Sequence, residues 1–172
     1  GDLLEGIIEV DETYVGGKPR KGTINNPDKT GKQNKRGRGT KKIPVVGLAQ
    51  RDGKVHAQVV KGINHKTLSR IIKEHINPET SKVFTDEFRS YCNIAGFVEH
   101  QTVDHQKEYV NGEVHTNTIE GFWALLKRGI MGQYHQVSAR HLPKYINEFC
   151  YRHNYRNNDL VFNQTISRAL GV

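Results

Sequence analysis

The stretch IIEVDETYVGG, residues 7–17, decides the fold of this chain. Its β-branched and aromatic residues, closed by two glycines, predict a first strand over residues 6–15. An acid, Asp11, stands inside that strand and is followed by a second acid, Glu12. Because a buried, unpaired charge costs several kcal/mol, the strand either exposes its acid at a sheet edge or gives it a cation partner.

Alternate side chains of a strand point to opposite faces, so the two acids fall on different faces. Asp11 shares its face with Ile7, Glu9 and Thr13. Glu12 shares its face with Ile8, Val10 and Tyr14. The strand pattern alone therefore leaves either Asp11 or Glu12 as the cation ligand.

The rest of the chain predicts a mixed α/β order of three strands, a helix, a strand, a helix, a strand and two helices. The further predicted strands cover 42–50, 54–60, 82–85 and 97–103, and the turn Arg51-Asp52-Gly53 joins the first two of these. The predicted helices cover 64–76, 87–96, a segment around Glu120 and roughly 139–154. Asn77-Pro78 ends the first helix, and a loop over 104–116 precedes the helix of Glu120. This is the order of the ribonuclease H-like fold, a mixed five-stranded sheet flanked by helices. Since the first and fourth strands of that fold are neighbours, Asp11 should lie close to an acid at the end of the fourth strand, Asp86.

Two further segments carry acids at the ends of predicted elements. Asp86 follows the strand in SKVFTDEFRSY, residues 81–91, and Glu120 opens the helix in VHTNTIEGFWALLKRG, residues 114–129. Each has a structural alternative, because Asp86 could cap a following helix and Glu120 could form a capping box with Asn117. Together with Asp11 they form the donor set of a divalent-cation site, since hard cations prefer carboxylate oxygens and phosphodiester chemistry often uses two such ions.

The helix that carries Glu120 also carries a base at a useful position. Lys127 follows Glu120 by seven residues, nearly two helical turns, so the two side chains lie within about 20° of one azimuth. Such a face could hold a metal ion and a phosphate together. Trp123 falls on the apolar stripe and is predicted to be core, while His115 either lines the metal site or is an exposed loop residue.

The charge of the chain is concentrated in one segment. The net charge is +8, and residues 18–42 hold ten Lys and Arg against the single acid Asp28. With Ile24 as its one apolar residue, this segment cannot order itself alone, so it is either a solvated loop or a flexible arm that binds a polyanion. The residues expected to contact DNA are Lys35, Arg36, Arg38, Lys41 and Lys42, together with Lys127.

Other features of the sequence limit the class of protein. The 172 residues fit one domain. Cys92 and Cys150 lack a CxxC spacing, and His100 and His105 lack partners for a zinc site, so we expect reduced packing cysteines and no structural zinc. No apolar run approaches the length of a membrane span, and we expect a soluble cytoplasmic protein.

Three segments, VDETYVGGK, VFTDEFRSY and the long stretch that begins VHTNTIEGFWALLKRG, resemble the DDE transposases of bacterial insertion sequences. The resemblance is to the ISXO-like group, which is related to eukaryotic Merlin elements, and it covers nearly the whole chain. It implies that Asp11, Asp86 and Glu120 are the catalytic triad and that Lys127 is its basic partner. Some relatives use Asn as the third member, which keeps Asn117 as an alternative to Glu120.

The resemblance also implies a cofactor and a mechanism. Asp11 would bridge two Mg²⁺ ions, for which Mn²⁺ can substitute, and Asp86 and Glu120 would each complete one site. The site would activate water or a 3′-hydroxyl for attack on a phosphodiester and stabilise the leaving 3′-oxygen. The implied partners are transposon-end and target DNA, with a homodimer in the DNA complex. The family's N-terminal DNA-binding region is not expected in this chain, which we interpret as the catalytic core alone.

Two other functions remain open at this stage. A ribonuclease H-like nuclease would use the same fold and metals, and strand transfer of a 3′-end would distinguish it from a transposase. A non-catalytic DNA-binding module would use the acids only as helix caps and surface charges, and it would bind no metal through Asp11.

Deleting residues 18–42 tests the role of the basic segment. If it supplies most of the DNA affinity, the slope of log K against log salt should fall by about 0.9 for each lost phosphate contact, because fewer counterions are released on binding. The measurement is duplex binding at several salt concentrations, and an unchanged slope would show that the segment is only a solvated loop.

Overall fold

The computed structural model describes residues 3–16, 42–86, 94, 96–103 and 115–171. Most of the predicted basic arm therefore lies outside the described residues, including Lys35, Arg36, Arg38 and Lys41. The predicted helix over 87–96, with Cys92, and His105 also lie outside them, apart from residues 94 and 96.

The centre of the fold is a five-stranded mixed sheet in the order β3-β2-β1-β4-β5. Its strands are β1 Leu4–Val15, β2 Ile43–Gln50, β3 Val55–Val59, β4 Ile76–Asp86 and β5 Glu99–Val103. β1 pairs antiparallel with β2 and parallel with β4, and β5 adds parallel to β4. The predicted mixed sheet is confirmed, and so is the pairing of the first strand with the fourth.

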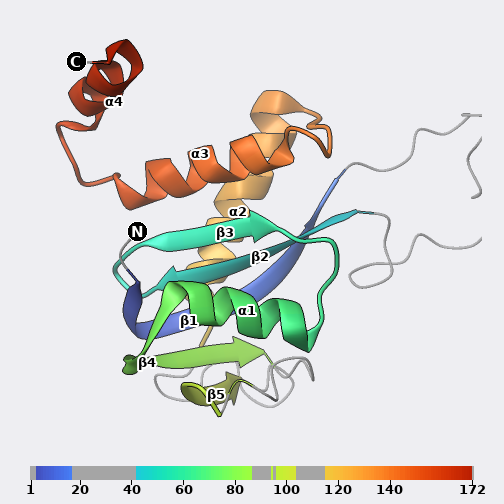
Figure 1. Ribbon diagram of the computed structural model, residues 1–172. Coiled ribbons are helices and arrows are strands. Elements are labelled where there is room, and N and C mark those ends of the chain that lie inside the picture. The colour runs from blue at the N-terminus through green and yellow to red at the C-terminus, as the bar shows by residue number, and fades with distance from the viewer. Residues whose placement is uncertain (1–2, 17–41, 87–93, 95, 104–114, 172) are drawn as a thin grey trace, which may run out of the picture.

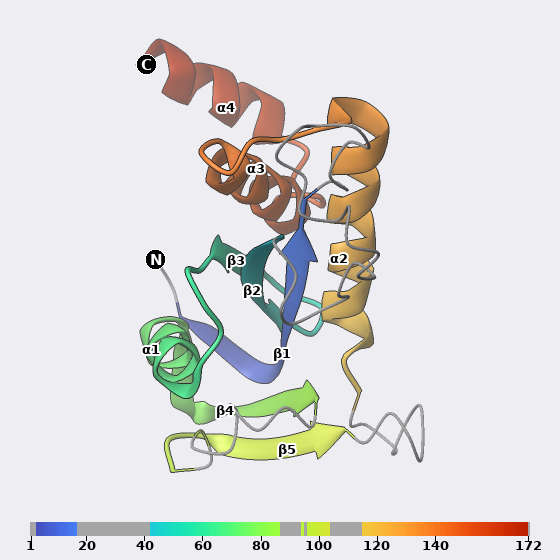
Figure 2. The ribbon, with the colours of Figure 1, turned by 90° about the vertical axis from the view of Figure 1, so that its right-hand side faces the viewer.

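Helices cover both faces of this sheet (Figures 1 and 2). α1, His65–His75, packs on one face through Leu68, Ile71 and Ile72. The other face is covered by α2, Asn117–Gly129, and by α3, Leu142–Asn154, which are joined through a short π-helix, η3, Ile130–Tyr134. A last helix, α4, Val161–Leu170, follows α3 and lies away from the sheet in both views.

The observed elements correct the sequence prediction in three places. β4 starts at Ile76, directly after α1, and not at residue 82. Four residues of β4 face a single residue of β1, because the register passes from Leu4↔Ile76 to Gly6↔Ser81, and this irregular stretch accommodates Pro78. The second difference is the presence of η3 and α4, which were not predicted. The third is the start of the helix expected over 139–154, which begins at Leu142 with a proline in its first turn.

Two smaller observations bear on the predicted class of protein. Cys150 is buried in α3, and burial raises the pKa of its thiol to about 11, so it is the packing cysteine that the sequence predicted. In the described ranges, no helix has both the length and the apolar character needed to cross a bilayer.

One buried carboxylate, Glu9 on β1, ties the sheet to α2. Glu9 is fully buried and accepts hydrogen bonds from the backbone N–H groups of Thr118 and Ile119, at 2.7 and 3.0 Å, and from the Thr118 hydroxyl at 3.0 Å. The Nε of Arg51, in the turn after β2, donates to the same carboxylate at 2.8 Å. Glu9 thus supplies the acceptor that the free N–H groups at the start of a helix require, and its charge is compensated by Arg51 and the helix dipole.

Replacing Glu9 by Gln should destabilise the fold by about 3 kcal/mol, because it removes the charge that Arg51 pairs with and turns an amide N–H₂ toward groups that are all donors. The measurement is the free energy of unfolding in urea. The matched control is Glu5→Gln on the same strand: Glu5 is exposed and accepts from Asn77, which Gln can also do, so its effect should stay within about 0.5 kcal/mol. Equal effects of the two substitutions would contradict the anchoring role of Glu9.

Candidate functional site

Two of the three predicted acids meet because β1 and β4 are parallel neighbours. Val10 of β1 pairs with Thr85 of β4, so Asp11 and Asp86 follow side by side at the same end of the sheet. One carboxylate oxygen from each of Asp11, Glu12 and Asp86 lies within 4.8 Å of the others. All three residues are half-buried. The structure thus brings Asp11 and Asp86 together and adds Glu12 to them.

The Asp11 carboxylate is electrostatically strained in the absence of a cation. Burial, and next the negative charge of Glu12, raise the pKa of Asp11 from 3.8 to about 7, and Asp86 adds to this effect. A backbone hydrogen bond at Glu12 and the indole of Trp123 lower the pKa of Asp11 but do not offset the burial. Three carboxylates this close together are a donor set of hard oxygens, which fits a divalent cation such as Mg²⁺.

Glu120 and Lys127 occupy the exposed side of α2. Among the described residues Glu120 is not part of the carboxylate group around Asp11, and its side chain accepts a hydrogen bond from the Thr116 hydroxyl at 3.1 Å. The alternative capping box with Asn117 does not form, since α2 starts at Asn117 and Thr116 is the N-cap residue. Glu120 is therefore not held in a cap by Asn117.

His115 lies beside Glu9, just before α2. Its Nδ1 is 3.3 Å from the Glu9 carboxylate, and its backbone carbonyl accepts from Arg51 at 3.0 Å. The sequence placed His115 either near the metal ligands or in an exposed loop, and in the structure it contacts Glu9, the carboxylate that anchors α2. Asn117 contacts the same histidine through its backbone N–H, at 3.4 Å from Nδ1.

Sequence reasoning missed the roles of Glu9 and Trp123. Trp123 is buried as predicted, yet its Nε1–H also donates to Oδ2 of Asp11 at 3.0 Å. Both residues carried a usable signal: Glu9 shares the face of Asp11 by strand alternation, and a buried tryptophan requires an acceptor for its N–H.

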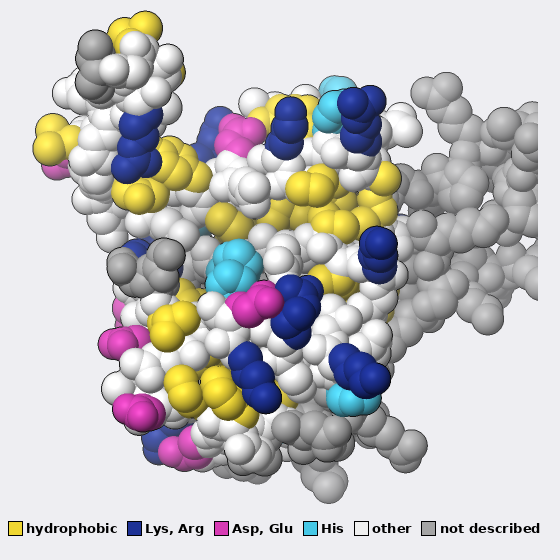
Figure 3. All heavy atoms as spheres, viewed as in Figure 1, with side chains coloured by type: hydrophobic (Ala, Val, Ile, Leu, Met, Phe, Trp, Pro, Cys, Tyr) yellow, Lys and Arg dark blue, Asp and Glu magenta, His cyan; other side chains and the backbone are white. Residues whose placement is uncertain are grey.

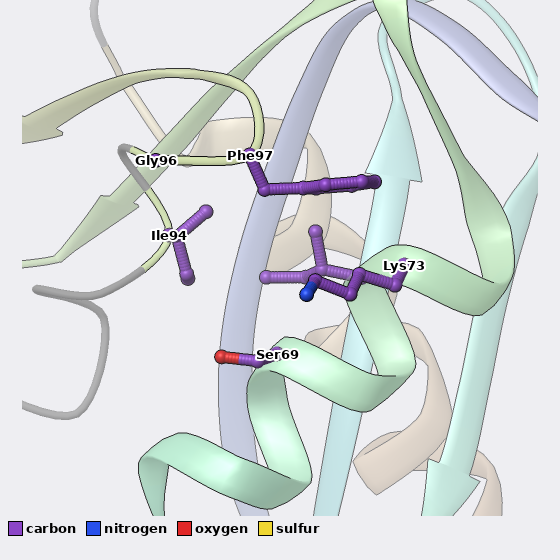
Figure 4. A pocket seen from close by; sticks show the side chains of 6 residues that line it. Ser69, Lys73, Ile94, Gly96 and Phe97 are labelled. Carbon is purple, nitrogen blue, oxygen red and sulfur yellow. The ribbon is translucent and has the colours of Figure 1, made fainter.

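A separate hollow lies away from this site. A pocket of about 230 Å³ lies between α1 and the residues before β5, on the opposite face of the sheet from Trp123 (Figure 4). It is lined by Ser69, Ile72, Lys73, Ile94, Gly96 and Phe97. The candidate site is instead a cluster of acids where β4 ends beside β1, an arrangement that suits a large substrate more than a small enclosed ligand.

Comparison with known proteins places the chain among transposases. A family described as ISXO2-like transposase domain matches residues 3–154. The chain is 32% identical over 153 residues to an uncharacterized protein in the transposable element ISH50 of Halobacterium salinarum, a match that covers 85% of this chain and 51% of that protein. An uncharacterized transposase-like protein of Haemophilus influenzae is 31% identical over 103 residues, which cover 59% of this chain and 81% of that protein. The chain thus spans about half the length of the ISH50 relative.

A solved structure shares the fold at low sequence identity. The catalytic core domain of BIV integrase aligns with a TM-score of 0.53 and 9% identity, over 85% of this chain and 81% of that one. This likeness concerns the fold alone, and it confirms the predicted ribonuclease H-like sheet.

The raised pKa of Asp11 predicts how stability depends on pH in the metal-free chain. The folded state keeps a proton on Asp11 up to about pH 7, while the unfolded state releases it near 3.8. The stability is therefore highest below that window and falls as pH rises through it, by up to about 1.4 kcal/mol per pH unit.

The Asp11→Asn substitution removes this titration. Urea unfolding in EDTA should therefore show the variant gaining stability over the wild type between about pH 4 and pH 7, with a constant difference above that range. A difference that does not vary with pH would contradict the raised pKa of Asp11.

Proposed function

The chain belongs to the ISXO2-like transposase domain family, as its motifs predicted, and we propose that it is the catalytic core of a metal-dependent DNA transposase. It would cleave phosphodiester bonds at transposon ends and transfer the ends to target DNA. The observation that carries this proposal is the convergence of Asp11, inside β1, and Asp86, the last residue of β4, within 4.8 Å of each other and of Glu12.

The residues that would hold the metal are Asp11 and Asp86, with Glu120 as the third carboxylate. Bound Mg²⁺ would lower the pKa of the attacking hydroxyl and stabilise the leaving oxygen. Asp11 would be the central ligand, because its carboxylate lies close to those of both Glu12 and Asp86. Glu120 stands at the start of α2 with its side chain exposed, where it accepts a hydrogen bond from the Thr116 hydroxyl that metal binding would replace.

The most positively charged segment of the sequence is the connection between β1 and β2. Residues 18–42 join Val15 to Ile43, which are paired at the end of β1 that follows Asp11 and Glu12. The face shown in Figure 3 carries Lys and Arg side chains scattered among acidic and apolar ones, without one continuous basic surface. We assign the main DNA-binding role to this arm, because it holds ten Lys and Arg, including Lys42, against one acid; Lys127 on the exposed side of α2 would assist it.

Glu120→Gln tests the proposed ligand set. The substitution keeps the shape of the side chain and removes its charge, so cleavage and strand transfer should fall together by about a hundredfold or more, since even partners outside the ligand shell are worth ten- to a hundredfold. Thermal stability should change little, because Glu120 is exposed. The measurement is a plasmid-nicking and strand-transfer assay with the full-length protein, in Mg²⁺ and in Mn²⁺.

Two matched variants complete the assay. Glu12→Gln alters the other acid near Asp11, and Asn117→Ala alters the neighbouring amide; both should keep most of the activity. Near-normal activity of Glu120→Gln would refute its assignment, and loss of activity in Glu12→Gln or Asn117→Ala would then identify the third ligand. Cleavage without strand transfer in the wild type would favour the nuclease alternative.

A further inference from the structure

Trp123 is the single tryptophan of the chain, and it joins α2 to the candidate site. Its side chain is 4% exposed and lies in the apolar layer between α2 and the sheet. From there its Nε1–H donates to Oδ2 of Asp11 at 3.0 Å. A carboxylate offers about four lone-pair positions on two oxygens, so Asp11 can accept this bond and still bind a cation.

The sheet makes room for this contact at one residue. Gly47 on β2 is the register partner of Asp11 on β1. A Cβ at position 47 would lie 2.6 Å from two ring carbons of Trp123 and 2.9 Å from Cδ1 of Ile119. Real Cβ atoms do not approach other atoms so closely, so the indole lies where any side chain at position 47 would be. The absence of a side chain beside Asp11 is therefore a condition for the Trp123–Asp11 hydrogen bond.

Packing alone does not explain a tryptophan at position 123. The neighbouring apolar positions of α2 on the same layer are filled by Ile119, Phe122 and Leu126, which have no donor to satisfy. Tryptophan brings an N–H that must find an acceptor when buried, and the acceptor here is the half-buried acid of the carboxylate group. The contact thus fixes one oxygen of Asp11 while the group that includes Glu12 and Asp86 remains close to it.

We propose that Trp123 is a positioning residue for Asp11: its indole N–H holds the carboxylate in the orientation that binds the divalent cation, and Gly47 provides the space for the indole. This inference rests on the proposed function, since it presumes that Asp11 is a metal ligand. It assigns Trp123 no contact with DNA or with the reacting atoms. Groups that orient a ligand in this way are typically worth ten- to a hundredfold in metal affinity.

The deciding experiment replaces Trp123 by 3-benzothienylalanine, in which sulfur stands where the indole has its N–H. The replacement keeps the ring size and removes only the donor, so folding and packing are preserved. Mg²⁺ titration by calorimetry, with Asp11→Ala as the metal-ligand control, should give a dissociation constant about tenfold weaker than that of the wild type, which is about 1.4 kcal/mol. Unfolding temperatures measured beside it should agree within a few degrees.

A spectroscopic measurement tests the same contact without activity. Since the chain has one tryptophan, its ¹⁵N spectrum has one indole N–H signal. That signal should shift when Mg²⁺ is added to the wild type and should not respond in Asp11→Ala. A wild type that binds Mg²⁺ by calorimetry while its indole signal stays unchanged would overturn the proposal.

A second pair of variants tests the space at position 47. Gly47→Ala should displace the indole and weaken Mg²⁺ binding by about tenfold or more. Gly62→Ala is the matched control, since a Cβ there meets nothing within 4 Å, and it should bind as the wild type does. If Gly47→Ala does not fold, the benzothienylalanine variant decides alone.

The outcomes distinguish a failure of the proposed function from a failure of the positioning role of Trp123. A wild type that binds no Mg²⁺ through Asp11 refutes the proposed function and this inference with it. A wild type that binds Mg²⁺, with equal affinity in the benzothienylalanine variant, refutes only the positioning role of Trp123.

Discussion

The structure depends on the burial of one charge. Glu9 is fully buried in the middle of the sheet, where an unpaired carboxylate would be strongly destabilising. The contact joins three separate segments: β1 carries the acid, the turn after β2 brings the donor Arg51, and α2 brings the donor N–H groups of Thr118 and Ile119. Because the charge is compensated only when all three meet, this contact fixes how α2 sits on the sheet, and it selects that arrangement against any in which the helix slides or turns.

Asp11, the next acid on the same face of β1, has a different environment from Glu9. Asp11 follows Glu9 by two residues and therefore points toward α2 as well. Glu9 receives at least four donated hydrogen bonds. Asp11 instead receives the Trp123 indole and faces two further acids, and burial, together with the charge of Glu12, raises its pKa to about 7. A carboxylate such as Glu9, whose charge is paired with donors and a cation, stabilises the fold. A carboxylate such as Asp11, which lies next to other acids, can bind a cation. The contrast between Glu9 and Asp11 distinguishes the structural acid from the candidate ligand better than their positions in the sequence do.

The sequence predicted what depends on local pattern. Alternation within residues 6–15, the Asp-Gly turn and the helical spacing of Leu68, Ile71 and Ile72 were sufficient for the mixed sheet and for the meeting of Asp11 with Asp86. What it missed depends on contacts between distant segments. No local pattern shows that Glu9 would accept from residues 109 and 110 positions away, or that Glu12 would join Asp86. The extension of β4 through Pro78 was missed for the same reason, since a register shift against β1 allows it.

α2 shows how a single helix can serve both the fold and the site. Thr118 and Ile119 contact Glu9, and Trp123 contacts Asp11. The spacing of these contacts is similar along both elements, because two strand residues span about 6.6 Å and four to five helix residues span about 6–7.5 Å. With these contacts made, Glu120 and Lys127 must lie on the outer side of the helix, where both are exposed. A shift of one residue at Glu9 would turn the helix by about 100°, which would withdraw the indole from Asp11 and move Glu120 to another side of the molecule. The anchoring of α2 by a buried acid therefore fixes both the position of the Trp123 indole at Asp11 and the outward orientation of Glu120 and Lys127.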